Sequence, residues 1–254
     1  MIRVVLIGYG NVGFHLYHAI KPLNDVEIVQ IYNRKSSFPK NLPKTTPIAN
    51  SFDKLEDADV YIMTVSDDAI ISVSQKIQLK SKLVVHTSGN TSMHAIDKKH
   101  RRGVFYPLQT FSIQRQINFS EVPICIETEN KEDEQLLQQL AEHLGCTTHK
   151  LSTDQRRSLH LAAVFVNNFT NHLYRIGHEL CESNRVPFDI LKPLIKETAS
   201  KLDDLTPFMA QTGPAKRGDS KTVNKHLELL ENEKQKEVYT TFSQLIANLY
   251  GKEL

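Results

Sequence analysis

The first thirteen residues constrain the fold of this chain more than any other segment. Residues 1–7 (MIRVVLI) are mostly apolar and predict a buried strand, and Gly8-Tyr9-Gly10-Asn11-Val12-Gly13 follows without a gap. Three glycines at this spacing, with a helix expected over residues 12–20, form the G-x-G-x-x-G fingerprint of dinucleotide binding. We therefore expect a strand, a tight turn and the amino end of a helix that faces a pyrophosphate.

Each glycine of this motif has its own expected task. Gly8 allows the tight turn out of the strand, Gly10 lacks the Cβ that would block a pyrophosphate, and Gly13 lets the helix lie close to the strand. Asn11 and Val12 supply backbone N–H groups where the helix dipole favours negative charge. The alternative is a glycine turn in an ordinary α/β domain that binds no nucleotide. The residues expected to bind a cofactor here are Gly8, Gly10, Asn11, Val12 and Gly13.

The rest of the first half alternates apolar strands with helices. The expected strands are 26–32, 59–65, 82–87, 104–106 and 122–127, and the expected helices are 68–77 and 131–144. Strands separated by helices indicate a doubly wound, mostly parallel sheet that binds ligands outside the carboxyl ends of its strands. The predicted class is α/β, with a doubly wound Rossmann-type sheet domain over residues 1–150.

The pattern changes near residue 150, and no convincing strand follows Ser152. Ser152 can cap a long helix that runs to about Asn184, and Asp219 or Ser220 can cap a later one. The other expected helices are 187–204, 220–231 and 234–250, with a loop over 206–218. We therefore predict that residues 151–254 form an all-α helical domain.

Bulk composition limits the partners of this chain. The net charge is +2, and the densest cationic stretch, residues 98–102, is too short to indicate a nucleic-acid or membrane surface. The three cysteines are far apart and lack metal-binding spacing, which indicates reduced thiols in a cytoplasmic protein. The first apolar run belongs to a strand, so we expect no signal peptide, and no segment is suited to span a membrane.

The residues that follow the second strand, Asn33-Arg34-Lys35, favour NADP over NAD. Proteins that bind NAD usually carry a carboxylate at this position, and a carboxylate would repel a 2′-phosphate. Asn33 is neutral, and the guanidinium of Arg34 can bind that phosphate or stack on adenine. The alternative is that Arg34 and Lys35 only begin a solvated basic loop.

Polar residues also follow two later strands, in residues 65–68 (VSDD) and 86–89 (HTSG). We expect Val65, Ser66 and Thr87 to contact the cofactor and Ser88 to contribute to catalysis, because both segments lie at the ligand edge of the sheet. The alternative is helix capping by Ser66 and turn formation by Ser88. Inside its apolar strand, His86 is better explained as a core histidine with satisfied hydrogen bonds.

Residues 159–169 are nearly all apolar, which predicts a helix buried on more than one side. A polar stripe at helical spacing runs along it, made of Arg157, His160, Asn167, Asn168, Asn171 and Arg175. In one interpretation the stripe lines a cleft, where His160 is a general acid or base and Asn168 orients a substrate. In the other it is a satisfied polar network between helices, at a dimer interface.

Several motifs together resemble a bacterial oxidoreductase family with an N-terminal Rossmann-like domain and a C-terminal helical domain of unknown function. They are Gly8–Gly13, VSDDAI at 65–70, HTSG at 86–89, YPLQTF at 106–111, HLAA at 160–163 with Asn168, TGP at 212–214 and RGD at 217–219. The family often has His where Tyr106 stands, which weakens an acid–base role at that position. Such proteins are similar to pyrroline-carboxylate reductases, deazaflavin-linked NADP oxidoreductases and 6-phosphogluconate-type dehydrogenases.

The resemblance implies NADP-linked hydride transfer and a helical domain that dimerises. We thus expect a small polar carbonyl, imine or hydroxy acid as the substrate, held near His160, Asn168 and Gln109, and a homodimer through the apolar faces of the C-terminal helices. Two alternatives stay open: a non-catalytic dinucleotide sensor, and a redox-inactive paralogue that stabilises a partner enzyme.

Overall fold

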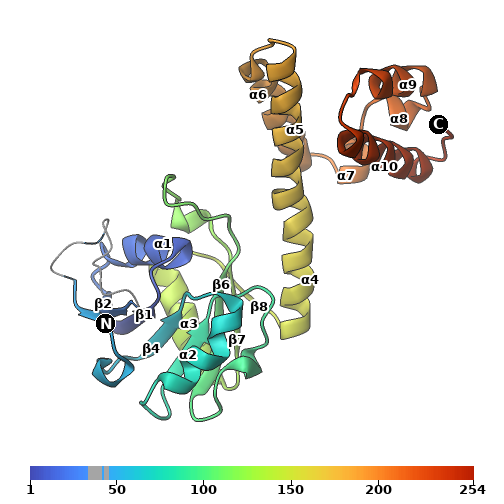
Figure 1. Cartoon of the computed structure of the whole chain (residues 1–254). Helices are drawn as coiled ribbons and strands as arrows, with labels where there is room; N and C mark the ends of the chain where they lie inside the picture. Colours follow the sequence, from blue (N-terminus) through green and yellow to red (C-terminus); the bar gives the residue numbers. More distant parts are fainter. Residues whose placement is uncertain (34–41, 43–45) are drawn as a thin grey trace. The chain divides into compact units, whose positions relative to one another are not determined.

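The computed structural model describes residues 1–33, 42 and 46–254 in two compact units, Met1–Asn168 and Phe169–Leu254 (Figure 1). The first unit contains the sheet, and the second is helical. Arg34 and Lys35, which were expected at the cofactor, lie outside the described residues.

Within the described residues, the first unit contains one sheet of eight strands in the order β3-β2-β1-β4-β5-β6-β7-β8. The strands are β1 (Ile2–Ile7), β2 (Val26–Tyr32), β3 (Ile48–Ala49), β4 (Val60–Met63), β5 (Leu83–His86), β6 (Arg101–Pro107), β7 (Ile124–Thr128) and β8 (Thr148–Lys150). The first six are parallel in the order 3-2-1-4-5-6 of the Rossmann fold, and β7 runs antiparallel to β6. The predicted sheet is confirmed. The two- and three-residue strands β3 and β8 were not predicted, because they are too short to show a periodic pattern.

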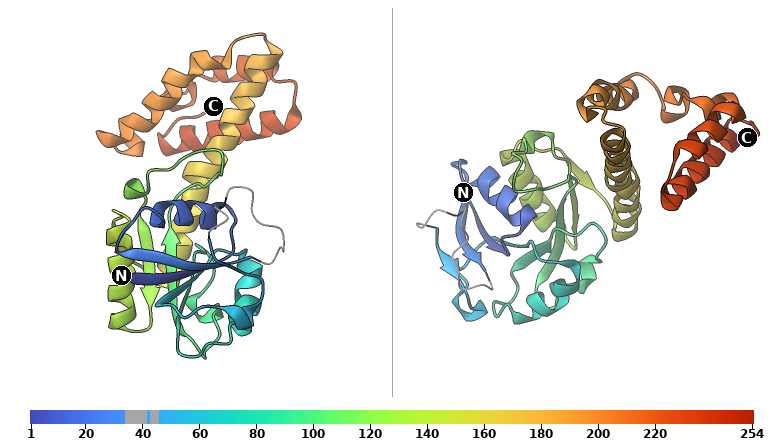
Figure 2. Two further views of the ribbon diagram at one scale, coloured as in Figure 1. Left: turned by 90° about the vertical axis from the view of Figure 1, so that its left-hand side faces the viewer. Right: turned by 45° about the horizontal axis from the view of Figure 1, so that its top comes forward.

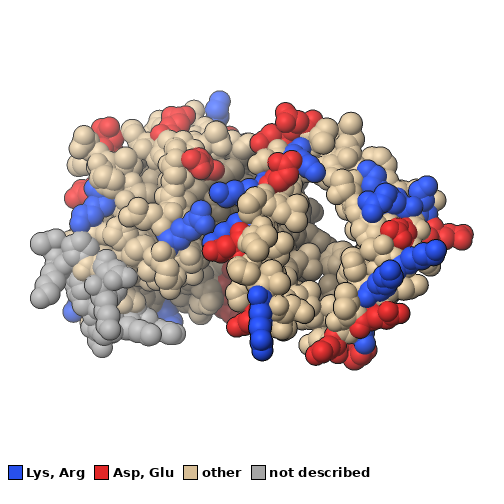
Figure 3. Space-filling model, turned by 90° about the horizontal axis from the view of Figure 1, so that it is seen from above, with Lys and Arg blue, Asp and Glu red and all other residues tan. Residues whose placement is uncertain are grey.

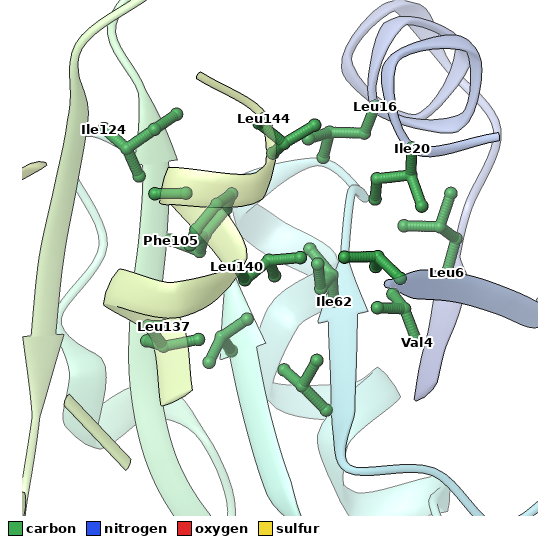
Figure 4. Packing of buried hydrophobic residues seen from close by; sticks show 14 of the residues in the cluster. Val4, Leu6, Leu16, Ile20, Ile62, Phe105, Ile124, Leu137, Leu140 and Leu144 are labelled. Atoms are coloured by element: carbon green, nitrogen blue, oxygen red, sulfur yellow. The ribbon is translucent and has the colours of Figure 1, made fainter. Parts of the chain in front are cut away.

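Helices cover both faces of this sheet (Figure 2). On one face α1 (Asn11–Ile20) and α3 (Lys131–His143) bury an apolar cluster against the strands (Figure 4). The other face packs on α2 (Ile70–Lys76) and neighbouring segments. Because both faces are covered, strands such as β4 and β5 are buried along their whole length, as is typical of parallel sheets.

Short 3₁₀ helices join the main elements of the first unit. They are η1 (Phe52–Lys54), η2 (Asp67–Ala69), η3 (Met93–Ala95) and η4 (Phe119–Glu121). The helix predicted over 68–77 is therefore a 3₁₀ turn followed by α2.

The first unit ends in α4 (Thr153–Ala163) and a π-helix, η5 (Val164–Phe169), whose last residue begins the second unit. Ser152 is the N-cap, as predicted, and it forms a capping box with Gln155. The secondary structure thus changes near residue 150, whereas the packing divides after Asn168. The reason is that α4 is tied to the sheet through its own side chains, including an ion pair between Arg156 and Glu127.

The second unit is all-α, as predicted. Its elements are α5 (Thr170–Ser183), η6 (Phe188–Leu191), α6 (Lys192–Ser200), η7 (Lys201–Asp203), α7 (Pro207–Ala210), α8 (Pro214–Arg217), α9 (Ser220–Leu229) and α10 (Glu233–Leu249). The prediction of a plain loop over 206–218 was wrong, because Pro207 and Pro214 each begin a one-turn helix there. Asp219 caps α9 through the backbone N–H of Thr222.

The expected burial of residues 159–169 is not observed in the single chain. Leu161, Phe165 and Val166 are 60%, 59% and 74% exposed. The prediction of a buried segment was therefore wrong for these three side chains.

The surface and the cysteines give further observations. On the face seen in Figure 3, Lys and Arg side chains are interspersed with Asp and Glu, in line with the net charge of +2. All three cysteines lie in described segments and are free thiols. Over the described ranges, no helix has the length and apolar character needed to cross a bilayer.

Candidate functional site

The carboxyl ends of three strands meet at one edge of the sheet. Ile7, the last residue of β1, pairs with Tyr32 of β2 and with Met63 of β4. The segments that follow these strands therefore begin at the same level. This is the point where the strand order reverses, and in open α/β sheets ligands bind there.

Thr64 fixes the glycine turn at this edge. Gly8 has a φ of +107°, and a Cβ added to it would lie 2.8 Å from the carbonyl oxygen of Thr64. A Cβ on Gly13 would lie 2.6 Å from Thr64 Oγ1. The Thr64 hydroxyl donates a 3.0 Å hydrogen bond to the Gly8 carbonyl. Sequence reasoning missed Thr64, which the sequence placed inside the expected strand 59–65.

Gly10 differs from its two neighbouring glycines because its surroundings are open. A Cβ built on it meets no atom of the described chain within 4 Å. It is the N-cap of α1, no side chain caps this helix, and the first turn contains no acidic residue. The amino end of α1 thus fits a diphosphate both in space and in charge.

The side chains of Asn11 and Val12 contact other parts of the sheet unit. The side-chain amide of Asn11 donates to the carbonyl of Phe111 at 3.0 Å, and Val12 packs on the core. Their expected contribution through N–H groups is compatible with this arrangement.

The edge opens into a cleft of about 500 Å³. Its lining residues are Gly8, Tyr9, Gly10, Tyr32, Asn33, Phe52, Thr64, Val65, Ser66, Ala69, Ser72, Val73 and Lys76. Five of the predicted cofactor residues are therefore brought together: Gly8, Gly10, Asn33, Val65 and Ser66. We call this space the glycine cleft.

Two further features of the glycine cleft were not predicted. The rings of Tyr32 and Phe52 stack with centroids 4.0 Å apart, and Lys76 adds a cation. Thr87, by contrast, is not among the lining residues, and its hydroxyl donates to the Met63 carbonyl at 3.3 Å. Aromatic stacking between segments that are far apart in the sequence leaves no local sequence pattern, so the contact between Tyr32 and Phe52 could not be predicted.

Ser88 and His86 build the turn after β5. The Ser88 hydroxyl oxygen accepts from the backbone N–H groups of Asn90 and Thr91, and Ser88 itself is buried. The hydroxyl is therefore committed to the turn, which is the alternative that the sequence left open. His86 accepts from the Ser88 N–H through Nδ1 and bonds the Ser92 carbonyl through Nε2. Burial lowers the pKa of His86 to about 4, so it is a neutral core histidine at neutral pH.

A second pocket of the first unit gathers the predicted substrate residues. It measures about 320 Å³ and is lined by Tyr106, Leu108, Gln109, Thr110, Leu159, His160, Ala162, Ala163, Val164, Val166, Asn167 and Asn168. We call it the amide pocket. His160, Asn168 and Gln109 thus line the same pocket, whose walls are formed by the end of β6 and the residues after it, by α4 and by the π-helix. π-Helices of this kind are frequent at functional sites.

The rest of the polar stripe does not line the amide pocket. Arg157 donates to the Asn90 carbonyl at 2.8 Å, and Asn171 and Arg175 belong to the second unit, where Arg175 pairs with Glu179. The predicted stripe assumes the spacing of a regular α-helix. The π-helix that follows Ala163 has wider turns, so the side chains beyond it point in other directions than this spacing predicts.

Arg156 is the buried charge that sequence reasoning missed. Its side chain is 1% exposed and forms an ion pair with Glu127. It also donates to the Thr91 carbonyl at 2.5 Å, and Glu127 accepts from the backbone N–H of Thr153 at 2.9 Å. The sequence offers nothing that separates Arg156 from its exposed neighbour Arg157.

Tyr106, which the resemblance discounted, contacts His160. Its hydroxyl lies 3.1 Å from His160 Nδ1. Burial is the main cause that raises the pKa of Tyr106 to about 12, and Cys125 and, more weakly, Asp67 add to it. Among the described residues, no group of His, Cys, Asp and Glu is arranged to hold a metal ion.

The strand order and the glycine cleft define this chain as a protein of the Rossmann-type dinucleotide-binding class. A solved "putative NADP oxidoreductase" from Bacteroides fragilis is 36% identical, with a TM-score of 0.88, over 97% of this chain and 98% of that protein. The sequence profile of a domain of unknown function (DUF2520) matches residues 122–246. The chain belongs to the family of the Bacteroides protein, in which a Rossmann-like domain precedes a helical domain of unknown function.

Other solved structures share the fold at lower identity. A Thermotoga maritima protein is 18% identical, with a TM-score of 0.73, over 98% of both chains. Pyrroline carboxylate reductase from Plasmodium falciparum, solved with NADP bound, is 16% identical, with a TM-score of 0.60, over 98% of this chain and 97% of that one. A search of curated proteins gave no match.

Proposed function

We propose that this protein is an NADP-dependent oxidoreductase that transfers a hydride between nicotinamide and a small polar carbonyl, imine or hydroxy-acid substrate. The observation that carries the proposal is the open space at Gly10, at the uncapped amino end of α1 and at the reversal point of the sheet. The name given to the Bacteroides relative and the NADP bound to the Plasmodium reductase of the same fold support it.

In this proposal the glycine cleft holds the dinucleotide. The backbone N–H groups from Asn11 to Gly13 bind the diphosphate. Asn33 lies at the adenosine end, where a neutral amide tolerates a 2′-phosphate, and Lys76 adds positive charge. Arg34, which is outside the described residues, is proposed to bind that phosphate or stack on adenine. Val65, Ser66 and, beside them, Thr87 lie toward the nicotinamide end.

The amide pocket holds the substrate. Asn168 and Gln109 orient its polar groups, and His160 gives a proton to the reacting oxygen or nitrogen or takes one from it. Ser88 contributes by shaping the turn against which His160 packs. When bound, the cofactor supplies the hydride, and the protein supplies orientation and electrostatics.

The helical unit forms the homodimer in this proposal. It is described in full, and its buried apolar residues are only Ala215, Val223, Leu230 and Ala247. A groove of about 400 Å³ between α5, α8 and α10 is lined mainly by apolar residues, among them Leu173, Phe242 and Ile246. A second copy of the same unit offers a matching apolar surface.

Titration with NADPH and NADH, followed by nucleotide fluorescence, tests cofactor binding. We expect NADPH to bind more tightly than NADH, and Gly10→Ala to weaken NADPH binding by about tenfold or more, about 1.4 kcal/mol. The backbone at Gly10 has a φ of −81°, so alanine fits the free protein without strain.

Gly177→Ala is the matched control. Gly177 also has open space around its missing Cβ but lies in α5 of the helical unit, so NADPH affinity should not change. Absence of affinity for both nucleotides, or unchanged affinity in Gly10→Ala, would refute the proposal. Binding without turnover on a broad panel of carbonyl and imine compounds would favour a non-catalytic sensor.

A further inference from the structure

The contact between Tyr106 and His160 is built into the sheet unit from two separate elements. Tyr106 is a buried residue of β6, and His160 lies on α4. The hydroxyl oxygen is 3.1 Å from Nδ1 of the imidazole, and the rings meet edge to face, with centroids 6.0 Å apart and an interplanar angle of 76°.

The turn after β5 leaves this ring pair little freedom. A Cβ added to Gly89 would lie 2.7 Å from His160 Nδ1 and 2.9 Å from Cζ of Tyr106, so the glycine packs against both rings. Arg156 and Arg157, one turn before His160, donate to the carbonyls of Thr91 and Asn90 in the same turn. The helix that carries His160 is thus tied to the backbone that confines the ring.

The direction of the hydrogen bond follows from the burial of the phenol. Among the described residues, the hydrogen-bond partner of the Tyr106 hydroxyl is Nδ1 of His160. If Nδ1–H donated instead, the buried phenol proton would be left without an acceptor, which costs about 1–3 kcal/mol. The raised pKa of Tyr106 keeps the phenol protonated at neutral pH, with Asp67, Cys125 and Arg156 as its charged or titratable neighbours.

We propose that Tyr106 is a positioning residue that holds the imidazole of His160 in the tautomer protonated at Nε2. Nδ1 is occupied as an acceptor, so the N–H group is at Nε2. Nε2 has no hydrogen-bond partner among the described residues, and His160 lines the amide pocket. If the proposed function holds, this N–H is a donor for the reacting heteroatom, which suits a carbonyl oxygen or a neutral imine nitrogen.

The tautomer can be read directly in the full-length protein labelled with ¹⁵N-histidine. Two-bond ¹H–¹⁵N correlation spectra distinguish Nε2–H from Nδ1–H rings, and His160→Gln identifies the His160 signals by their loss. We expect the Nε2–H pattern for His160 in the wild type and a mixture of both tautomers in Tyr106→Phe. This measurement needs neither nucleotide nor substrate, so its outcome is independent of whether the proposed function fails.

Tyr61→Phe is the control for removal of a buried phenol hydroxyl. The Tyr61 hydroxyl accepts from the Ala58 N–H at 3.1 Å and donates to the Glu56 carbonyl at 2.7 Å, so His160 should keep its wild-type pattern there. An Nδ1–H pattern in the wild type would overturn the proposal, and this holds even if Tyr106→Phe does not fold. An unchanged tautomer in a folded Tyr106→Phe variant would overturn it equally.

Discussion

The two units of this chain are stabilised in different ways. The sheet unit buries its strands on both faces and satisfies most of its buried polar groups within itself, as at His86 and Glu127. The helical unit leaves large apolar side chains exposed, with Leu229 at 76% and Leu249 at 64%. The comparison indicates that the first unit has an extensive core of its own, whereas the second leaves apolar side chains exposed that the proposed homodimer would cover.

This difference also separates what each unit contributes to function. Both pockets that carry the proposed chemistry lie within the sheet unit, and the apolar groove lies within the helical unit. Changes in the sheet unit should therefore affect folding and ligand binding, and changes in the helical unit should affect association.

The largest expected effect comes from breaking the buried ion pair of the sheet unit. Arg156→Met leaves the partly buried Glu127 carboxylate without its cation and should lower the free energy of unfolding by about 3–5 kcal/mol. Urea unfolding followed by circular dichroism measures the change. Arg157→Met is the control one residue along, where an exposed side chain should account for less than about 1 kcal/mol. Equal losses in the two variants would show that Arg156 is not the brace between α4 and the sheet.

The same residue shows where prediction from sequence reaches its limit. The doubly wound, mostly parallel sheet, the glycine turn and the cap at Ser152 were predictable, because each depends on a local pattern or on spacing along the chain. Arg156 and Thr64 were not, because their partners, Glu127 and Gly8, are far away in the sequence. Tyr106 was discounted because the family often has His at its position, and its contact with His160 exists only after β6 and α4 pack together.

The π-helix and the exposed apolar segment illustrate two other limits. The sequence predicted one regular helix from Ser152 to about Asn184, and nothing in the apolar run marks the wider turn at Val164–Phe169. The same run was expected to be buried, and in one chain it is not. Periodicity indicates an apolar helix face, but it does not tell whether another part of the fold covers that face.

The next largest effect is expected in the apolar groove of the helical unit. Phe242→Asp places a charge among apolar side chains and should weaken the proposed homodimer by about 2–4 kcal/mol, because a central aromatic residue often dominates an interface. Sedimentation velocity over a range of concentrations measures the dimer affinity. Ile71→Asp, at an exposed apolar position of α2 in the sheet unit, should leave it unchanged. A wild-type protein that stays monomeric throughout would contradict the proposed dimer.

The smallest of these effects is the acid sensitivity that His86 gives to the sheet unit. Its pKa of about 4 in the folded state lies below the ordinary value of 6.5, so the unfolded chain binds a proton first as the pH falls. Protonation of His86 therefore lowers the free energy of unfolding as the pH falls from about 6.5 to about 4 and has little effect above pH 6.5. Between pH 7 and pH 5 the loss amounts to about 2 kcal/mol. His86→Gln keeps a hydrogen-bonding side chain but cannot titrate. Although less stable at pH 7, it should lose about 2 kcal/mol less than the wild type between pH 7 and pH 5 in urea unfolding. Parallel losses in the two proteins would mean that His86 is protonated as easily in the fold as outside it, and that acid acts through other groups.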